Sequence, residues 1–111
     1  MPKSAPRRLR LEVYLPFTTP LAYEEAKNWV VAEFLRNFGG CSINEPIEGW
    51  YESLDGSAIR DEVTIIYSDT PLLDKRRERL VRLYGQSLKL FLAFELNQED
   101  VLVAVWPLDH L

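Results

Sequence analysis

A strict alternation of apolar and polar residues between Leu9 and Leu15 constrains the fold of this chain more than any other feature. Apolar side chains occupy every second position there, and charged or aromatic side chains occupy the positions between them. Because successive side chains of a strand point to opposite faces of a sheet, this period of two predicts a strand with one buried face. A sheet built on such a strand needs an apolar cover on one side only.

The first segment expected to supply that cover is a helix from Pro20 to Phe38. Thr19 suits its N-cap, Pro20 suits its first position, and Gly39-Gly40 suits its end, since glycine accepts a left-handed cap. One side of the helix is apolar at helical spacing. That predicted stripe consists of Tyr23, Ala26, Val30, Phe34 and Phe38.

A second helix is expected to begin at Thr70-Pro71, which repeats the helix-start signal. Gly85 falls on the polar side of this helix, so one long helix is predicted, with a break at Gly85 as the alternative. Its predicted buried stripe consists of Leu73, Leu80, Leu83, Tyr84, Phe91 and Phe94.

Three further strands are predicted around these helices. Segment 41–54 contains Pro46, which cannot donate a ladder hydrogen bond and is therefore expected at a sheet edge or a bulge. Asp55-Gly56 predicts a type I′ hairpin turn into strand 57–67. In that strand Val63, Ile65 and Tyr67 are assigned to one face, and Arg60, Glu62, Thr64 and Ile66 to the other. Segment 101–106 is the last strand, and Pro107 is expected to end it.

The resulting order is strand–helix–strand–strand–helix–strand, which predicts an α+β, ferredoxin-like βαββαβ domain. We expect a four-stranded antiparallel sheet in the order 4-1-3-2 with both helices on one face. The 111 residues suit one domain, assigned to 9–107 between tails at 1–8 and 108–111. The helices are expected to bury Leu9, Leu11, Val13, Val63 and Ile65, and the opposite sheet face stays open.

Composition excludes several functions. The single cysteine, Cys41, and single histidine, His110, give no disulfide and no metal-ligand spacing, so neither a metal nor a cofactor is expected. No apolar run approaches a membrane span, and a cytoplasmic protein is expected. A net charge of −4 argues against nucleic-acid binding. The basic run 75–79 with Arg82 is interpreted as a solvated helix face.

Spaced motifs in the chain are similar to those of a group of small bacterial proteins. They are Gly39-Gly40-Cys41-Ser42, Gly49-Trp50, Asp55-Gly56, Glu62 and the closing segment 97–103. The chain departs from that group in having Asn97 where glycine is usual and a direct Gly49-Trp50 pair. The resemblance implies a ferredoxin-like fold and no established activity.

The residues that handle protons or attack carbonyls give no catalytic constellation. His110 is the penultimate residue of an expected tail, and Cys41 follows a helix C-terminus, whose dipole disfavours a thiolate. Gly39-Gly40 follows a helix, whereas phosphate-binding loops precede one.

The open sheet face is therefore the candidate ligand-binding site. Its predicted residues are Arg10, Glu12, Tyr14, Arg60 and Glu62. Antiparallel pairing is expected to set Arg10 near Glu62 and Glu12 near Arg60, a stabilising arrangement that needs no ligand. The functional alternative is a buried polar pocket, in which Arg60 holds a small anionic ligand and Glu62 acts as a base.

The main hypothesis is a homodimer, closed through the open face, with a structural or small-molecule-binding role. Trp50 and Trp106 are the interface candidates, because tryptophan at strand edges often serves contacts. One alternative is a cofactor-independent enzyme of the dimeric α+β barrel type that uses Tyr14 and Glu62. A second alternative is an RNA-binding module that displays aromatic residues on the two central strands.

Overall fold

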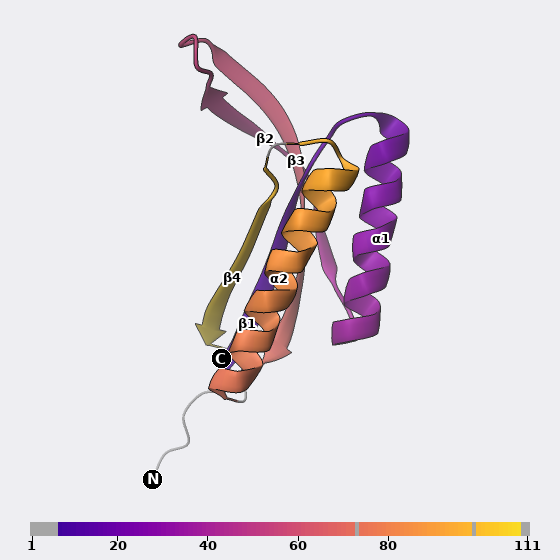
Figure 1. Cartoon of the computed structure of the whole chain (residues 1–111), viewed down its shortest axis with the longest axis vertical. Coiled ribbons are helices and arrows are strands. Elements are labelled where there is room, and N and C mark those ends of the chain that lie inside the picture. The colour runs from indigo at the N-terminus through magenta and orange to yellow at the C-terminus, as the bar shows by residue number, and fades with distance from the viewer. Residues whose placement is uncertain (1–6, 73, 99, 110–111) are drawn as a thin grey trace.

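The chain forms one four-stranded sheet and two helices in a computed structural model that describes residues 7–72, 74–98 and 100–109 (Figure 1). The elements are β1 (Arg7–Pro16), α1 (Pro20–Phe38), β2 (Ser42–Glu52), β3 (Ala58–Pro71), α2 (Lys75–Glu95) and β4 (Leu102–Asp109). All neighbouring strands are antiparallel, in the order β2-β3-β1-β4, which reads 4-1-3-2 from the β4 edge. The predicted α+β class, with an antiparallel sheet and two helices, is confirmed.

The predicted alternation of β1 and the predicted cap residues of α1 are confirmed. The alternating leucines and valine of β1 are buried beneath the helices. Thr19 caps α1, its hydroxyl accepting a hydrogen bond from the Ala22 amide at 3.3 Å. Gly39 ends the helix with φ +81° and donates its amide to the Leu35 carbonyl at 3.0 Å. The alternation of apolar residues therefore predicted β1, and the cap residues predicted both ends of α1.

β3 turns toward the helices the set of side chains that was predicted to face away. Val13 lies opposite Ile66, and Leu15 lies opposite Thr64. Because directly opposed residues of an antiparallel pair share a face, Thr64, Ile66, Ser68 and Thr70 lie under the helices. The prediction that Val63 and Ile65 lie there is wrong.

Hydrogen bonds make this burial of hydroxyl groups possible. The Thr64 hydroxyl lies 2.5 Å from the Tyr23 hydroxyl, and Ser68 donates to the Gly40 carbonyl at 2.6 Å. Buried polar groups are tolerated where they have such bonds. The sequence pattern grouped the polar Thr64 with the charged residues of the exposed face, although Thr64, Ser68 and Thr70 are buried.

α2 is one continuous helix, but its buried side differs from the predicted one. It begins after the N-cap Asp74, since β3 continues through Pro71, so the start predicted at Thr70-Pro71 is wrong. The buried residues are Val81, Gly85, Leu88 and Leu92. The predicted stripe is wrong at Leu80, Leu83, Phe91 and Phe94, which are exposed; Tyr84 is half-buried, and Leu73 lies outside the described residues.

Gly85 explains this difference. A Cβ atom at this position would lie 3.2 Å from a Leu11 methyl group and 3.4 Å from a Val105 methyl group. A side chain as large as leucine would hold the helix away from the sheet, so glycine allows the close approach. The prediction that Gly85 lies on the polar side is wrong.

The β2–β3 hairpin extends beyond the ends of both helices (Figure 1). β2 is an edge strand with a bulge between Asn44 and Ile47, which bears out the expectation for Pro46. The tip is not a type I′ turn, because Gly56 has positive φ and Asp55 does not. Instead, the Asp55 carboxylate accepts hydrogen bonds from Ser53 and Ser57, which lower its pKa to about 2.

The outer ends of β1 and β4 are longer than predicted. β4 continues through Pro107 to Asp109, so the expected stop at Pro107 is wrong; an edge strand tolerates proline. Arg7, in the predicted tail, pairs with Asp109 at 3.2 Å. His110 lies outside the described residues.

Candidate functional site

The sheet face opposite the helices, here called the open face, carries side chains from every strand. In its centre, β1 contributes Arg10, Glu12 and Tyr14, which are half-buried. The register places their neighbours on the same face. From β3 these are Asp69, Tyr67 and Ile65, and from β4 they are Trp106, Ala104 and Leu102.

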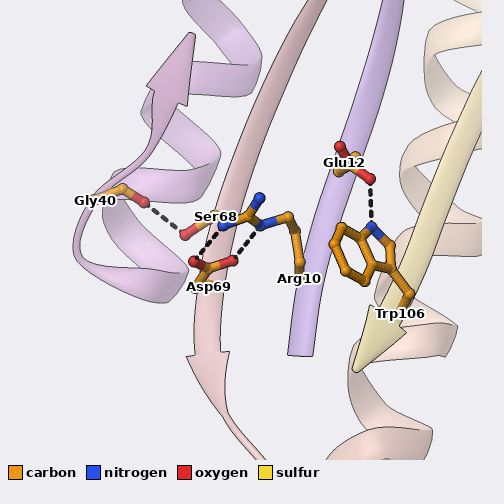
Figure 2. Close-up of polar contacts among 6 residues, drawn as sticks. All are labelled: Arg10, Glu12, Gly40, Ser68, Asp69 and Trp106. Carbon is orange, nitrogen blue, oxygen red and sulfur yellow. Dashed lines mark hydrogen bonds and ion pairs between the residues drawn. The ribbon is translucent and has the colours of Figure 1, made fainter. Parts of the chain in front are cut away.

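The most structured part of this face is the Arg10 cluster, which consists of Arg10, Glu12, Tyr67, Asp69 and Trp106. The Arg10 guanidinium donates two hydrogen bonds to the Asp69 carboxylate, at 2.7 and 3.0 Å (Figure 2). It also lies 4.3 Å from the centre of the Tyr67 ring and 5.5 Å from that of Trp106. A bidentate ion pair and two cation–π contacts hold this side chain in one place.

Within the cluster, the positive charge of Arg10 is paired with a carboxylate of the same chain. The hydrogen bond from Arg10 to Asp69 raises the pKa of the guanidinium, although burial acts in the opposite sense. Glu12 accepts a hydrogen bond from the Trp106 indole N–H. The cluster is therefore an arginine already bound to a carboxylate, and Arg10 presents no unpaired charge for an anionic ligand.

The structure does not bring the five predicted site residues together. Arg10, Glu12 and Tyr14 lie on the open face. Arg60 and Glu62 are an even number of residues from the buried Thr64 along β3, so they lie on the opposite face, in the projecting hairpin. The predicted Arg10–Glu62 and Glu12–Arg60 pairs are wrong. Arg60 instead pairs with Glu48 at 2.6 Å and with Glu62 at 3.5 Å.

Sequence reasoning missed Tyr67 and Asp69, the two β3 members of the cluster. The sequence pattern groups Tyr67 with Val63 and Ile65, and Asp69 lies beyond the predicted strand 57–67. The overlooked signal is that the alternation of β3 continues past Tyr67. Ser68 and Thr70 continue the series of every second residue that begins with Thr64 and Ile66, so all four belong to one face. A strand of 14 residues accounts for both errors.

The two interface candidates lie in different places. Trp106 lies on the open face against the Arg10 cluster, while Trp50 is opposite Arg60 on the other face of the hairpin. Both are exposed. Only Trp106 is thus placed to contact a subunit that covers the open face.

A hollow of about 250 Å³ adjoins the Arg10 cluster at the start of β2. Tyr67, Asp69 and Cys41 contribute to its wall. Burial raises the pKa of the Cys41 thiol, which works against a reactive thiolate. The hollow has room for a small molecule, and its wall shows no activated nucleophile among the described residues.

The described residues also bear on metal binding and on membrane insertion. Residues 7–72, 74–98 and 100–109 contain no group of three histidine, cysteine, aspartate or glutamate residues placed to hold a metal ion. Neither α1 nor α2 is long and apolar enough to cross a membrane.

Comparison with known proteins gives a fold but no family. No protein-family model and no curated protein matches the chain. A phage SAM lyase in its apo state is similar over 99% of this chain and 95% of its own, with 18% identity and a TM-score of 0.54. CutA from Synechococcus elongatus PCC7942 matches 99% of this chain and 81% of its own, with 19% identity and a TM-score of 0.48. CutA1 from Oryza sativa matches 98% of this chain and 84% of its own, with 17% identity and a TM-score of 0.46.

At these identities the lyase shows a shared fold alone. The class defined by the fold is that of small α+β domains in which two helices cover one face of an antiparallel sheet. The site adds to that class an open face with a paired arginine between aromatic rings.

Proposed function

We propose that the chain is a self-associating ferredoxin-like domain, a homodimer in which the open faces of two sheets pack against each other. The observation that carries the proposal is the Arg10–Asp69 ion pair, held between Tyr67 and Trp106 on the uncovered face. The role that follows is structural.

The pairing of Arg10 with Asp69 makes the centre of this face suitable for burial. An unpaired charge taken out of water is costly, whereas a paired and hydrogen-bonded one is tolerated. Arg10 already donates hydrogen bonds to both carboxylate oxygens of Asp69, and Glu12 accepts one from the indole N–H of Trp106. A second subunit therefore covers the Arg10–Asp69 pair without having to supply a counter-charge for it.

Apolar side chains on the outer strands supply the driving force. Leu102 and Trp106 on β4 and Ile47 on β2 are exposed on this face. Burial of apolar area contributes about 25 cal/mol per Å², and tryptophan is prominent among residues that dominate interfaces. The polar centre and apolar margins together favour a specific contact over nonspecific aggregation.

The test compares two leucine-to-arginine variants by sedimentation velocity at micromolar concentration. Leu102→Arg places a charge in the proposed interface and is expected to lower the sedimenting mass relative to the wild type. Leu54→Arg, at the exposed hairpin tip, is the matched control and is expected to sediment like the wild type. Equal sedimentation of the wild type and both variants would overturn the proposal.

A second candidate is binding of single-stranded RNA. It is favoured by one observation, that Tyr14 on β1 and Tyr67 on β3 lie on the open face of the two central strands. Aromatic residues there stack on bases in some RNA-binding domains of this fold. The homodimer ranks first because Arg10 already covers the Tyr67 ring, and a net charge of −4 opposes phosphate binding. Absence of RNA retention in a low-salt filter assay eliminates this candidate.

The enzyme and the anionic ligand receive less support. Tyr14 and Glu62 lie on opposite faces of the sheet, so they do not converge on one substrate. Arg60, the expected anion-binding group, is already shared by Glu48 and Glu62. The non-catalytic homodimer is the function that the geometry supports best.

A further inference from the structure

α2 has a second apolar row that its own sheet does not use. The first row packs on the sheet through Val81, Leu88 and Leu92. The second row, here called the α2 seam, consists of Leu80, Leu83, Ser87, Leu90 and Phe94. Its leucines and phenylalanine are 50%, 52%, 72% and 82% exposed, in chain order.

The spacing of the α2 seam is that of a coiled coil. Successive members are three, four, three and four residues apart. This 3.5-residue period keeps a row of side chains facing one partner helix, whereas a random surface distribution of leucines has no such period. The seam spans about four turns, so its apolar side chains form a continuous ridge.

We infer that the α2 seam binds the α2 seam of a second copy of this chain, antiparallel and related by a two-fold axis at Ser87. Ser87 is the middle member, with Leu80 and Phe94 each seven residues away. An antiparallel pair therefore sets Leu80 against the partner's Phe94, and Leu83 against the partner's Leu90 and Phe91. The small serine at the axis lets the two helices approach closely, as an isologous contact requires.

The charges along α2 select the antiparallel orientation. Basic residues crowd its beginning, at Lys75, Arg76, Arg77 and Arg79, and Glu95 lies in its last turn. A parallel pair would bring the two basic ends together. The antiparallel pair brings each basic end beside the acidic end of the other helix, and it also opposes the two helix dipoles.

Two of these charges have no counter-ion in the described part of the chain. Neither Arg76 nor Glu95 takes part in an ion pair there. Glu95 and Glu25 line a groove of about 200 Å³ between α2 and α1, walled by the stacked rings of Trp29 and Phe91. With the axis at Ser87, Arg76 lies about 4.5 Å along the helix axis beyond the level of the partner's Glu95, so these two charges are at the same end of the helix pair.

The test is thiol cross-linking at the predicted axis. In a Cys41→Ser background, Ser87→Cys brings two thiols together across the two-fold axis, and a short bis-maleimide is expected to give a covalent dimer. Gln86→Cys is the matched control, because Gln86 lies on the side of α2 that faces β4. Cross-linking of Ser87→Cys alone supports the inference; equal cross-linking of both variants, or of neither, overturns it.

The outcome is independent of the proposed open-face dimer. The α2 seam and the open face lie on opposite sides of the sheet, so an open-face dimer keeps the two Ser87 positions apart. Adding Leu90→Glu is expected to abolish the Ser87→Cys cross-link, while Leu102→Arg is expected to leave it unchanged. The reverse pattern would refute the seam. Because Leu90 is largely exposed, unchanged circular dichroism is expected for Leu90→Glu.

Discussion

Replacing Thr64 by valine tests the face assignment of β3 through one buried hydrogen bond. The two hydroxyls of Thr64 and Tyr23 lie 2.5 Å apart, and the residues are 1% and 7% exposed. Valine keeps the shape of threonine but leaves the Tyr23 hydroxyl without this bond in a dry environment. An unsatisfied buried hydroxyl costs about 1–3 kcal/mol.

A double-mutant cycle isolates this bond. Thr64→Val and Tyr23→Phe are each expected to destabilise the chain by about 1–3 kcal/mol, because each leaves the hydroxyl of the other residue buried without a hydrogen-bond partner. The double variant removes both hydroxyls, so its loss is expected to be smaller than the sum by at least about 0.5 kcal/mol.

Urea denaturation followed by tryptophan fluorescence measures all four proteins. A loss of about 2 kcal/mol lowers the midpoint by about 1 M at a typical slope of about 2 kcal/mol per M. The protein concentration is held fixed, because self-association makes apparent stability depend on it. If Thr64→Val stays within about 0.5 kcal/mol of the wild type, and the two changes add, Thr64 faces solvent and the face assignment is refuted.

Two further predictions concern the helices. Gly85→Leu is expected to cost about 1–3 kcal/mol in urea denaturation by overpacking against Leu11 and Val105, whereas Gln86→Leu on the exposed side changes stability little; equal effects would contradict the close approach of α2. Burial and a hydrogen bond to Glu33 raise the pKa of Tyr84 to about 12, from 10. The unfolded chain therefore releases this proton first, so stability is expected to fall as the pH rises from 10 to 12, and less in Tyr84→Phe. The absorbance titrations of the wild type and Tyr84→Phe at 295 nm are expected to differ by one tyrosine near pH 12.

The elements that sequence could predict are those whose signals are local. β1 is specified by seven alternating residues, and α1 by a threonine cap, a proline and a glycine stop. Pro46 likewise predicted the bulged edge strand, because a residue without an amide N–H cannot donate a ladder hydrogen bond in any sheet.

The errors arose where tertiary contacts decide between two equivalent faces. β3 has apolar residues on both faces, and tertiary contacts such as the hydrogen bond between Thr64 and Tyr23 show which face is inside. α2 likewise has two apolar rows, and the contact of Gly85 with Leu11 selects the row that packs. A glycine on a helix is read from sequence as a weak point, whereas here it marks the closest contact.

The candidate site depended on those same choices. Arg10, Glu12 and Tyr14 were placed on the open face because the pattern of β1 is unambiguous. Arg60 and Glu62 were misplaced because β3 was assigned to the wrong faces, and for the same reason Tyr67 and Asp69 were missed. No sequence pattern reports that Arg10 binds Asp69, since that contact joins residues 59 positions apart.

The most direct test of the central proposal is the mass of the unmodified chain in solution. Light scattering at low micromolar concentration is expected to give at least the mass of two 12.9 kDa chains, because the open faces pair at that concentration, and a larger mass where the α2 seams also pair. A clean 12.9 kDa monomer that persists as the concentration is raised would contradict the proposed homodimer.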